Sequence, residues 1–237
     1  MNRLTVIQDL INKINAKSYL EIGVCFGDII INVDVKNKYG VDPKFQIPNL
    51  EVNGKETFYD TKNNIMTLYE LESDTFFKNF AKKDLHNGID IAFVDGLHSY
   101  PQSLKDVENC LKYLNPNGFI IMHDCNPLNY AMSYPIVNSI NEVIELGEKG
   151  ELEGWNGAWN GDVWKALVHL RVKHDDLEIF TIDIDWGLGI IRKGKSNQLK
   201  DITIQDIEIS DYYFLEKNRE KLLNLKHPRY FKEFLLN

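Results

Sequence analysis

Ionisable side chains stand at two places along the chain where an apolar, β-rich run ends. Asp95 and His98 follow the run IDIAFV, and His123 and Asp124 close the run FIIMHD. Both runs are typical of buried strands in a parallel sheet, and the carboxyl ends of such strands open into one crevice. Two imidazoles and two carboxylates would then meet there. Groups of this kind can remove a proton from a hydroxyl group or hold a divalent cation.

Two mechanisms are open for this cluster. In the first, His98 or His123 is a general base, since an imidazole with an ordinary pKa of about 6.5 is matched to neutral pH. In the second, Asp95 and Asp124 hold a Mg²⁺ ion, which would lower the pKa of a bound hydroxyl group. Histidine is an uncommon ligand for Mg²⁺. One histidine alone is more often structural, but burying four such groups together is costly, and we expect His98 and Asp124 foremost to be functional.

A glycine-containing loop follows the first apolar run, SYLEI. It reads Glu21-Ile-Gly23-Val-Cys-Phe-Gly27, a G-x-x-x-G spacing that differs from the G-x-G-x-x-G of dinucleotide-binding loops. Glycine at such a place lets the backbone approach a ligand closely. Glu21 suits a cation better than a phosphate group, and S-adenosylmethionine (SAM) carries an amino group and a sulfonium ion. The loop therefore favours SAM over NAD.

Further polar residues stand at the ends of the next two predicted strands. Asp42 closes KYGVD and could accept hydrogen bonds from both hydroxyl groups of a ribose. Ser73 and Asp74 follow the run NIMTLYE and could face an adenine edge. The alternative is that the glycines only make turns and that Asp42 caps a helix. We favour a cofactor site formed by Glu21, Gly23, Gly27, Asp42, Ser73, Asp74, Asp95 and Gly96.

A loop rich in tryptophan, glycine and asparagine begins at Trp155 and reads WNGAWNGDVWK. Aromatic faces beside amide donors suit a platform for a sugar, or a lid over the molecule that is to be modified. The alternative is that Trp164 packs the following helix and that the glycines only make turns. We expect Trp164 in the core. The residues expected to contact the acceptor are Tyr100, Asn160, Asp162 and Lys165.

These residues need a scaffold that brings strand ends together. Apolar residues recur at helical spacing over residues 2–16, and β-rich runs then alternate with helical segments as far as Asp124. This alternation predicts a doubly wound α/β fold. The segment EIFTIDIDWGLGIIRK predicts a hairpin at a sheet edge, and residues 44–64 are turn-rich with no role that we can assign. We expect a single domain over residues 1–237, with a core of about 17–193 and a charged helical extension over 194–237.

Composition excludes several classes of protein. The net charge of −8 argues against a protein whose main task is to bind nucleic acid. Three cysteines without a C-x-x-C pair form neither a disulfide framework nor a zinc site. No run approaches the roughly 18 apolar residues of a membrane span, and the N-terminus lacks a signal-peptide core. We expect a cytoplasmic protein that acts on a small molecule, and the aromatic residues of its tail are compatible with a homodimer.

Four segments resemble the class I SAM-dependent methyltransferases of methyltransferase family 24, especially members from bacterial surface-glycan and natural-product biosynthesis. They are YLEIGVCFGD, YGVDP, IDIAFVDGLHSYPQSLKDVENCLKYLNPNGFIIMHDCNP and WNGDVWKALVHLR, and the resemblance runs from about Tyr19 to about Lys193. The D-G-x-H-x-Y and L-x-P-x-G…H-D-C blocks are fairly specific for the family. Cys25 stands where many class I members have a third glycine.

The resemblance implies a Rossmann-like, seven-stranded and mostly parallel sheet with an antiparallel last strand. It also places Glu21, Gly23 and Gly27 beside the methionine part of SAM, Asp42 by its ribose and Asp74 by its adenine. The implied function is O-methylation of a small acceptor: a sugar, a nucleotide-sugar or a phosphorylated intermediate of surface-glycan (polysaccharide) biosynthesis. Some members resemble Mg²⁺-dependent enzymes, but this chain has HDC where those often have paired acids.

Other functions stay open at this point. N-methylation of an amino sugar is the nearest variant, and it would need no metal. The chain could also be a catalytically silent SAM-binding module in a biosynthetic complex, although the intact His98, His123 and Asp124 argue against this. A hydroxylase is disfavoured because no two-histidine, one-carboxylate iron signature is evident. An NAD-linked dehydrogenase is disfavoured by the glycine spacing.

Overall fold

The computed structural model describes residues 1–60, 62 and 64–236. The chain folds as two compact units, which are described one at a time. The first unit comprises residues 1–96 and 105–121, and the second comprises residues 97–104 and 122–237. The expectation of a single domain with a C-terminal extension stays a prediction.

The first unit is built on a six-stranded sheet in the order β3-β4-β2-β1-β5-β6. Strands β1, β2, β4 and β5 run parallel, and β3 is antiparallel to β4. The residues that follow the parallel strands therefore lie at one edge of this sheet. The strands are β1 (Ser18–Ile22), β2 (Asn37–Asp42), β3 (Lys55–Tyr59), β4 (Ile65–Glu70), β5 (Ile89–Val94) and β6 (Leu114–Met122).

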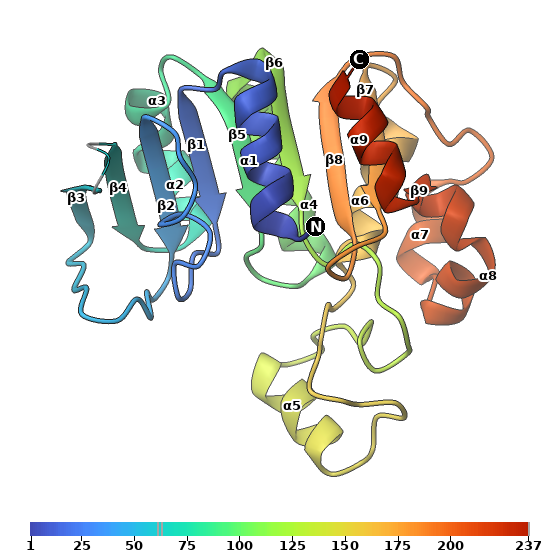
Figure 1. Ribbon diagram of the computed structural model, residues 1–237. Helices are drawn as coiled ribbons and strands as arrows, with labels where there is room; N and C mark the ends of the chain where they lie inside the picture. The colour runs from blue at the N-terminus through green and yellow to red at the C-terminus, as the bar shows by residue number, and fades with distance from the viewer. Residues whose placement is uncertain (61, 63, 237) are drawn as a thin grey trace. The chain divides into compact units, whose positions relative to one another are not determined.

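Helices cover the sheet of this unit. Figure 1 shows α1 (Arg3–Ile14) lying over the strands, and its apolar face, which includes Val6 and Leu10, is buried. The helix begins with a capping box between Asn2 and Thr5, because each side chain satisfies a backbone N–H of the other residue. The further helices are α2 (Ser73–Asn79) and α3 (Ala81–Asp84) after β4, and α4 (Tyr100–Tyr113) after β5; α4 begins in the second unit and continues into the first.

A buried cation ties the turn-rich segment 44–64 to this sheet. The side chain of Lys38 on β2 is fully buried, and its Nζ lies 2.9 Å from Asp60 Oδ2 and donates to the carbonyl oxygen of Ile30 at 3.0 Å. Although partial burial opposes ionisation of Asp60, hydrogen bonds from Lys38 and Asn64 hold the pKa of this carboxyl group well below its usual range. The segment is thereby anchored at its C-terminal end.

Replacing Lys38 with methionine is expected to lower the free energy of unfolding by about 2–3 kcal/mol, because the apolar stem is kept while the carbonyl oxygens and Asp60 lose their partner. Urea unfolding measures this change. Lys62→Met is the matched control, since the exposed Lys62–Asp34 pair at 3.0 Å is worth at most about 1 kcal/mol. Equal effects of the two substitutions would contradict the prediction.

The second unit contains a small three-stranded arrangement in the order β8-β7-β9. Strands β7 and β8 form an antiparallel hairpin, and β9 is parallel to β7. Figure 1 shows α5 standing apart from the other helices of this unit. The elements are α5 (Ile140–Glu148), α6 (Val163–Lys173), β7 (Leu177–Ile182), β8 (Leu188–Lys193), α7 (Ile204–Ile209), α8 (Tyr212–Leu223), β9 (Leu225–Lys226) and α9 (Pro228–Leu236).

The segment 127–161, which we call the cap segment, has a hydrophobic cluster of its own. Ala131, Val143 and Leu152 are buried in it, and Trp155 and Trp159 pack against them. Glycine is required at position 147, because a Cβ there would stand 2.2 Å from the ring of Trp155. The cap segment therefore forms a separate small core in the second unit.

The predicted fold class is confirmed, with one difference. The described residues contain nine strands where seven were expected, because β3 forms in segment 44–64 and β9 in the tail. The antiparallel hairpin near the end of the core and the buried position of Trp164 are as predicted. No helix among the described residues has the length and apolar character that a membrane crossing requires.

Candidate active site

The glycine loop after β1 is held by Asp42 at the end of β2. Asp42 Oδ2 accepts from the backbone N–H of Cys25 at 2.9 Å, and Oδ1 accepts from the N–H of Lys44 at 2.8 Å. Cys25 has φ +47°, the left-handed conformation that glycine adopts most easily. The carboxylate thus fixes the loop conformation through the backbone, in addition to any contact with a ligand.

Gly23 and Asp95 approach each other closely in the first unit. Gly23 has φ +87°, and a Cβ on it would stand 2.0 Å from the carbonyl oxygen of Asp95. The Asp95 carboxylate accepts from the Arg3 guanidinium at 3.0 Å, and Gly96 follows it in the chain. Gly27, at the other end of the loop, has φ +79°. The ends of β1, β2 and β5 therefore converge around this loop.

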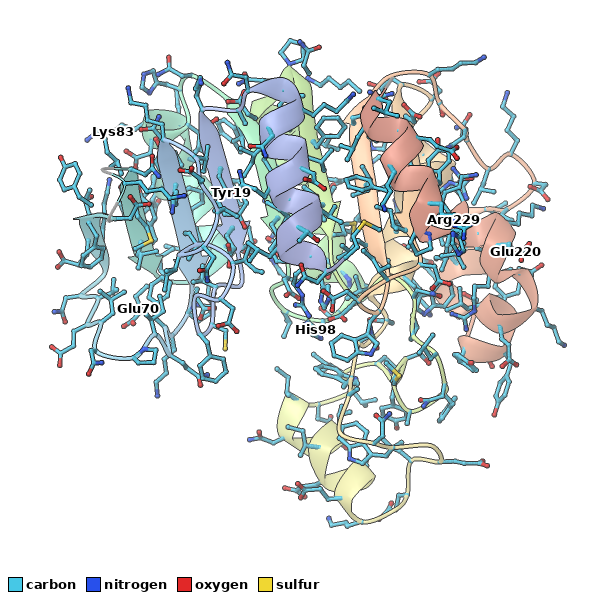
Figure 2. The ribbon with its side chains drawn as sticks, in the orientation of Figure 1. Tyr19, Glu70, Lys83, His98, Glu220 and Arg229 are labelled. Atoms are coloured by element: carbon cyan, nitrogen blue, oxygen red, sulfur yellow. The ribbon has the colours of Figure 1, made fainter. Side chains whose placement is uncertain are left out.

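Glu21 lies beneath the loop rather than on its surface. Only 1% of the residue is exposed, and the hydroxyl group of Tyr19 donates to its carboxyl group at 2.5 Å. Figure 2 shows Tyr19 among the strands of the first unit. Burial raises the pKa of Glu21 well above its usual value, and the nearby carboxylates of Asp95 and Asp42 raise it further. The Glu21 carboxyl group is therefore more readily protonated than an exposed glutamate.

Ser73 and Asp74 lie at the start of α2, which follows β4. The carboxylate of Asp74 accepts from Lys105 Nζ at 2.5 Å, and both side chains are about half exposed. These residues are at the expected edge of the sheet. Their contact with adenine stays a prediction.

In the second unit, three nitrogen atoms lie close to the carboxylate of Asp124, and one of them, Asn160 Nδ2, donates a hydrogen bond to it. Asn160 Nδ2 lies 2.7 Å and His123 Nδ1 3.2 Å from Oδ1, and His98 Nε2 lies 3.2 Å from Oδ2. Asn160 is 1% exposed and His123 is 3% exposed. The structure therefore brings together three of the four predicted catalytic residues around one buried carboxylate, and it adds Asn160.

The backbone of the cap segment orients His98, which Figure 2 labels. His98 Nδ1 lies 3.1 Å from the carbonyl oxygen of Trp159. The imidazole ring of His98 stacks on the indole ring of Trp159, with 5.3 Å between the ring centroids. A carbonyl oxygen can only accept, so Nδ1 carries a proton. In the neutral form of His98 the lone pair is then on Nε2, beside Asp124.

The β7–β8 turn supports the other side of Asp124. The backbone N–H groups of Cys125 and Asn126 donate to carbonyl oxygens of this turn, at 3.0 and 2.8 Å. Asp185 Oδ1 in the turn lies 3.8 Å from His123 Nε2. Asp124 itself has φ +59°, an uncommon conformation for a residue with a side chain, and such strain is concentrated at functional sites.

The predicted acceptor residues fall into two groups. Tyr100, Asp162 and Lys165 line one pocket of the second unit, where Asp162 Oδ1 accepts from the backbone N–H of Tyr100 at 2.7 Å. Asn160 is not among them, because its amide faces Asp124. A direct contact of Asn160 with an acceptor thus stays a prediction, whereas its contact with the Asp124 carboxylate is in the structure.

Sequence reasoning missed Trp159 and Tyr19 as residues that orient the site. Trp159 contributes a backbone carbonyl group, which no residue type reveals. Tyr19 could have been found, because residues two apart on a strand share one face, and a tyrosine two positions before a buried glutamate can donate to it. Asp185 was hidden in a turn that is distant in sequence from His123.

Comparison with known proteins was made by family model and by sequence. Residues 20–125 match the methyltransferase domain of methyltransferase family 24. The uncharacterized protein R132 of Acanthamoeba polyphaga mimivirus is 30% identical over 135 residues, which cover 54% of this chain and 59% of the viral protein. The chain thus spans about three fifths of the length of this curated relative.

Comparison of structures shows the fold. A proposed caffeoyl-CoA O-methyltransferase from Staphylococcus aureus aligns with a TM-score of 0.51 at 19% identity, covering 82% of this chain and 85% of that one. The O-methyltransferase TomG of Streptomyces achromogenes, in complex with SAM, aligns with a TM-score of 0.47 at 12% identity, covering 80% and 78%.

Proposed function

We propose that the chain, whose residues 20–125 match the methyltransferase domain of methyltransferase family 24, is a SAM-dependent O-methyltransferase that acts on a hydroxyl group of a small acceptor. The observation that carries the proposal is the Asp124 carboxylate with His98 and His123 on its two oxygens. This arrangement can accept and stabilise the proton that an acceptor hydroxyl group loses.

The first unit offers groups that fit SAM. The loop between Gly23 and Gly27 presents backbone without bulky side chains at the edge where parallel strands end, which is where such sheets bind nucleotides. Carboxylates gather there: Glu21, Asp42 and Asp95 influence one another electrostatically, and Asp74 is nearby in sequence after β4. Acidic groups suit the amino group, the sulfonium ion and the ribose hydroxyl groups. Bound SAM supplies the methyl group and its own leaving group.

His98 is the proposed general base. Its side chain is 25% exposed, so an acceptor can reach it, whereas the side chain of His123 is 3% exposed. The Trp159 carbonyl oxygen keeps the proton of His98 on Nδ1, which leaves Nε2 to take the proton of the acceptor. The imidazolium ion that forms then donates to Asp124 Oδ2, 3.2 Å away, and its charge is stabilised by the carboxylate.

His123 and Asn160 have a positioning role in this proposal. Asn160 donates to Asp124 Oδ1 and His123 Nδ1 lies 3.2 Å from the same oxygen, so that Oδ2 faces His98. The orientation of the Asn160 amide is fixed, because only its NH₂ group can donate to a carboxylate. The fold thus defines the direction in which the proton moves.

The predicted Mg²⁺ ligands are each bound to nitrogen donors. Asp124 accepts from the Asn160 amide and has two imidazole nitrogens 3.2 Å away, and Asp95 accepts from the Arg3 guanidinium. Mg²⁺ would need these carboxylate oxygens as ligands, and nitrogen groups already contact them. We therefore derive no step through a metal, and the dependence on Mg²⁺ is a matter for experiment.

The test is a methyl-transfer assay with SAM labelled at its methyl group and a panel of sugars, amino sugars, nucleotide-sugars and sugar phosphates. Label transferred to a hydroxyl group, in EDTA as well as in Mg²⁺, supports the proposal. Label on nitrogen alone would make the protein an N-methyltransferase. Isothermal titration with SAM and NAD is run first, because a protein that binds NAD and not SAM could not be a SAM-dependent methyltransferase.

Binding of SAM is expected to release a proton from Glu21. Burial raises the pKa of this carboxyl group in the free protein, and a cationic ligand lowers it again because it favours the ionised form. Affinity should therefore rise with pH, by up to about tenfold per unit, until the pH reaches the pKa of the free protein. Calorimetry in buffers of different ionisation enthalpy measures the proton. Glu21→Gln should abolish this proton release. Uptake of a proton by the wild type on SAM binding would contradict the assignment of the released proton to Glu21.

The finer identity of the acceptor is part of the same proposal. A sugar, nucleotide-sugar or phosphorylated intermediate of surface-glycan biosynthesis is the class that the motif resemblance supports. A role for Tyr100, Asp162 and Lys165 in binding it is supported by the pocket that they share.

A further inference from the structure

A pocket of about 390 Å³ opens in the second unit next to the proposed base. Its lining includes Leu97 and Ser99, the two chain neighbours of His98. It also includes Asp162, which follows Gly161, and a Cβ on Gly161 would stand 1.9 Å from the carbonyl oxygen of His98. The two segments are therefore in backbone contact, and whatever fills the pocket lies close to His98.

The charged side chains of this pocket are two acids and one base. Asp162 and Glu208 face it together with Lys165. Lys165 Nζ donates to the backbone carbonyl oxygen of Glu208 at 3.2 Å, and Asp162, Asp211 and Glu208 all stabilise its charge. The positive charge of Lys165 is thus already balanced by the carboxylates around it. The pocket carries a net negative charge and would repel a phosphate or carboxylate group.

The uncharged part of the lining has both polar and apolar character. The hydroxyl group of Tyr100 is paired with His169 Nδ1 at 2.6 Å, and Pro101 and Ile136 offer apolar surface. Burial raises the pKa of Asp162 and lowers that of Lys165, which indicates that the pocket is partly shielded from water. Carboxylates only accept hydrogen bonds, so a matching ligand must be rich in donors.

We infer that this pocket binds the acceptor through a ring that bears hydroxyl or amino groups and no anionic group, as in a neutral sugar or an amino sugar. The volume lies at the lower end of the range for small-molecule sites and suits a single ring. This inference rests on the proposed function and narrows it, because it excludes acceptors whose phosphate group would enter the pocket.

The test measures binding of three probes to the full chain without cofactor: glucose, glucosamine and glucosamine 6-phosphate, by saturation-transfer NMR titration. Glucose and glucosamine are expected to bind at least about tenfold more tightly than the phosphate ester. Equal or tighter binding of glucosamine 6-phosphate would overturn the inference, and so would the failure of all three probes to bind.

Reversing the charge of one side chain that lines the pocket tests whether the probes bind there. Glu208→Lys changes the balance of the pocket from one net negative to one net positive charge, and it should reverse the preference in favour of glucosamine 6-phosphate by about tenfold. The matched control is Glu220→Lys, on α8 and labelled in Figure 2, which should leave the preference unchanged. The same preference in Glu208→Lys as in the wild type would show that the probes bind elsewhere.

The proposed function and this inference can fail separately. The probe titration needs neither SAM nor turnover, so it is informative even if the protein does not bind SAM. If SAM binds and label is transferred only to phosphorylated acceptors, the methyltransferase proposal stands and the pocket inference falls.

Discussion

Asp124→Asn is expected to lower kcat by about 10²–10⁴-fold while SAM affinity stays within about threefold. In the wild type, His98 Nε2 lies 3.2 Å from Asp124 Oδ2, where the carboxylate can stabilise an imidazolium ion. The neutral amide of the variant cannot do this, and its NH₂ group competes with the donors that surround it. Single-turnover methyl transfer measures the chemical step, and calorimetry measures the SAM affinity. The effect should fall on kcat more than on KM, because the interaction forms as the proton moves.

Asparagine is the right substitution at this position. Asp124 has φ +59°, and asparagine tolerates the left-handed conformation better than other residues with a Cβ, so the backbone should be preserved. Asp176→Asn is the matched control, because Asp176 is 70% exposed and should leave kcat unchanged. A variant at position 124 with the wild-type kcat would remove His98 and Asp124 from the mechanism. A fall in the unfolding temperature that matches the loss of activity would assign the effect to folding.

Gly23→Ala is expected to weaken SAM binding by at least about a hundredfold. The added Cβ would stand 2.0 Å from the carbonyl oxygen of Asp95 and 2.7 Å from the Cα of Gly96, both of which are backbone atoms that cannot rotate away. The loop or the end of β5 must therefore shift, and a shift of about 1 Å at a binding site commonly costs two orders of magnitude. Isothermal titration with SAM measures the loss.

The matched control separates this contact from backbone strain. Gly54 in the same unit has φ +74°, and a Cβ there would meet nothing within 4 Å. Gly54→Ala should therefore destabilise the protein by about 1 kcal/mol and leave SAM affinity unchanged. If both variants bind SAM as the wild type does, the loop after β1 is not the cofactor site.

Much of the first unit could be predicted because its signals are local. The apolar runs that end at Ile22, Asp42 and Val94 became parallel strands, since buried strands of a parallel sheet need continuous apolar residues. Strand β3 could not be predicted, because its residues 55–59 alternate between half-buried and exposed at a sheet edge. Its position depends on pairing with β4, which is not a local property.

The candidate site was predicted as far as residue types could reveal it. His98, His123 and Asp124 were identified as ionisable groups at strand ends, and two of the contacts around Asp124 join these residues. The contact of Asn160 with Asp124 was not predicted, because an asparagine in a glycine-rich loop gives no sign of which group it faces. The partner of Glu21, by contrast, is two residues away on the same strand.

The separate core of the cap segment confines much of its sequence requirement to its own packing. That packing depends on Ala131, Val143, Leu152 and the tryptophans that cover them. Its links to the proposed base and to Asp124 are the carbonyl group and indole ring of Trp159 and the amide of Asn160. Exposed positions elsewhere in the segment can therefore be substituted while the contacts of His98 and Asp124 are kept.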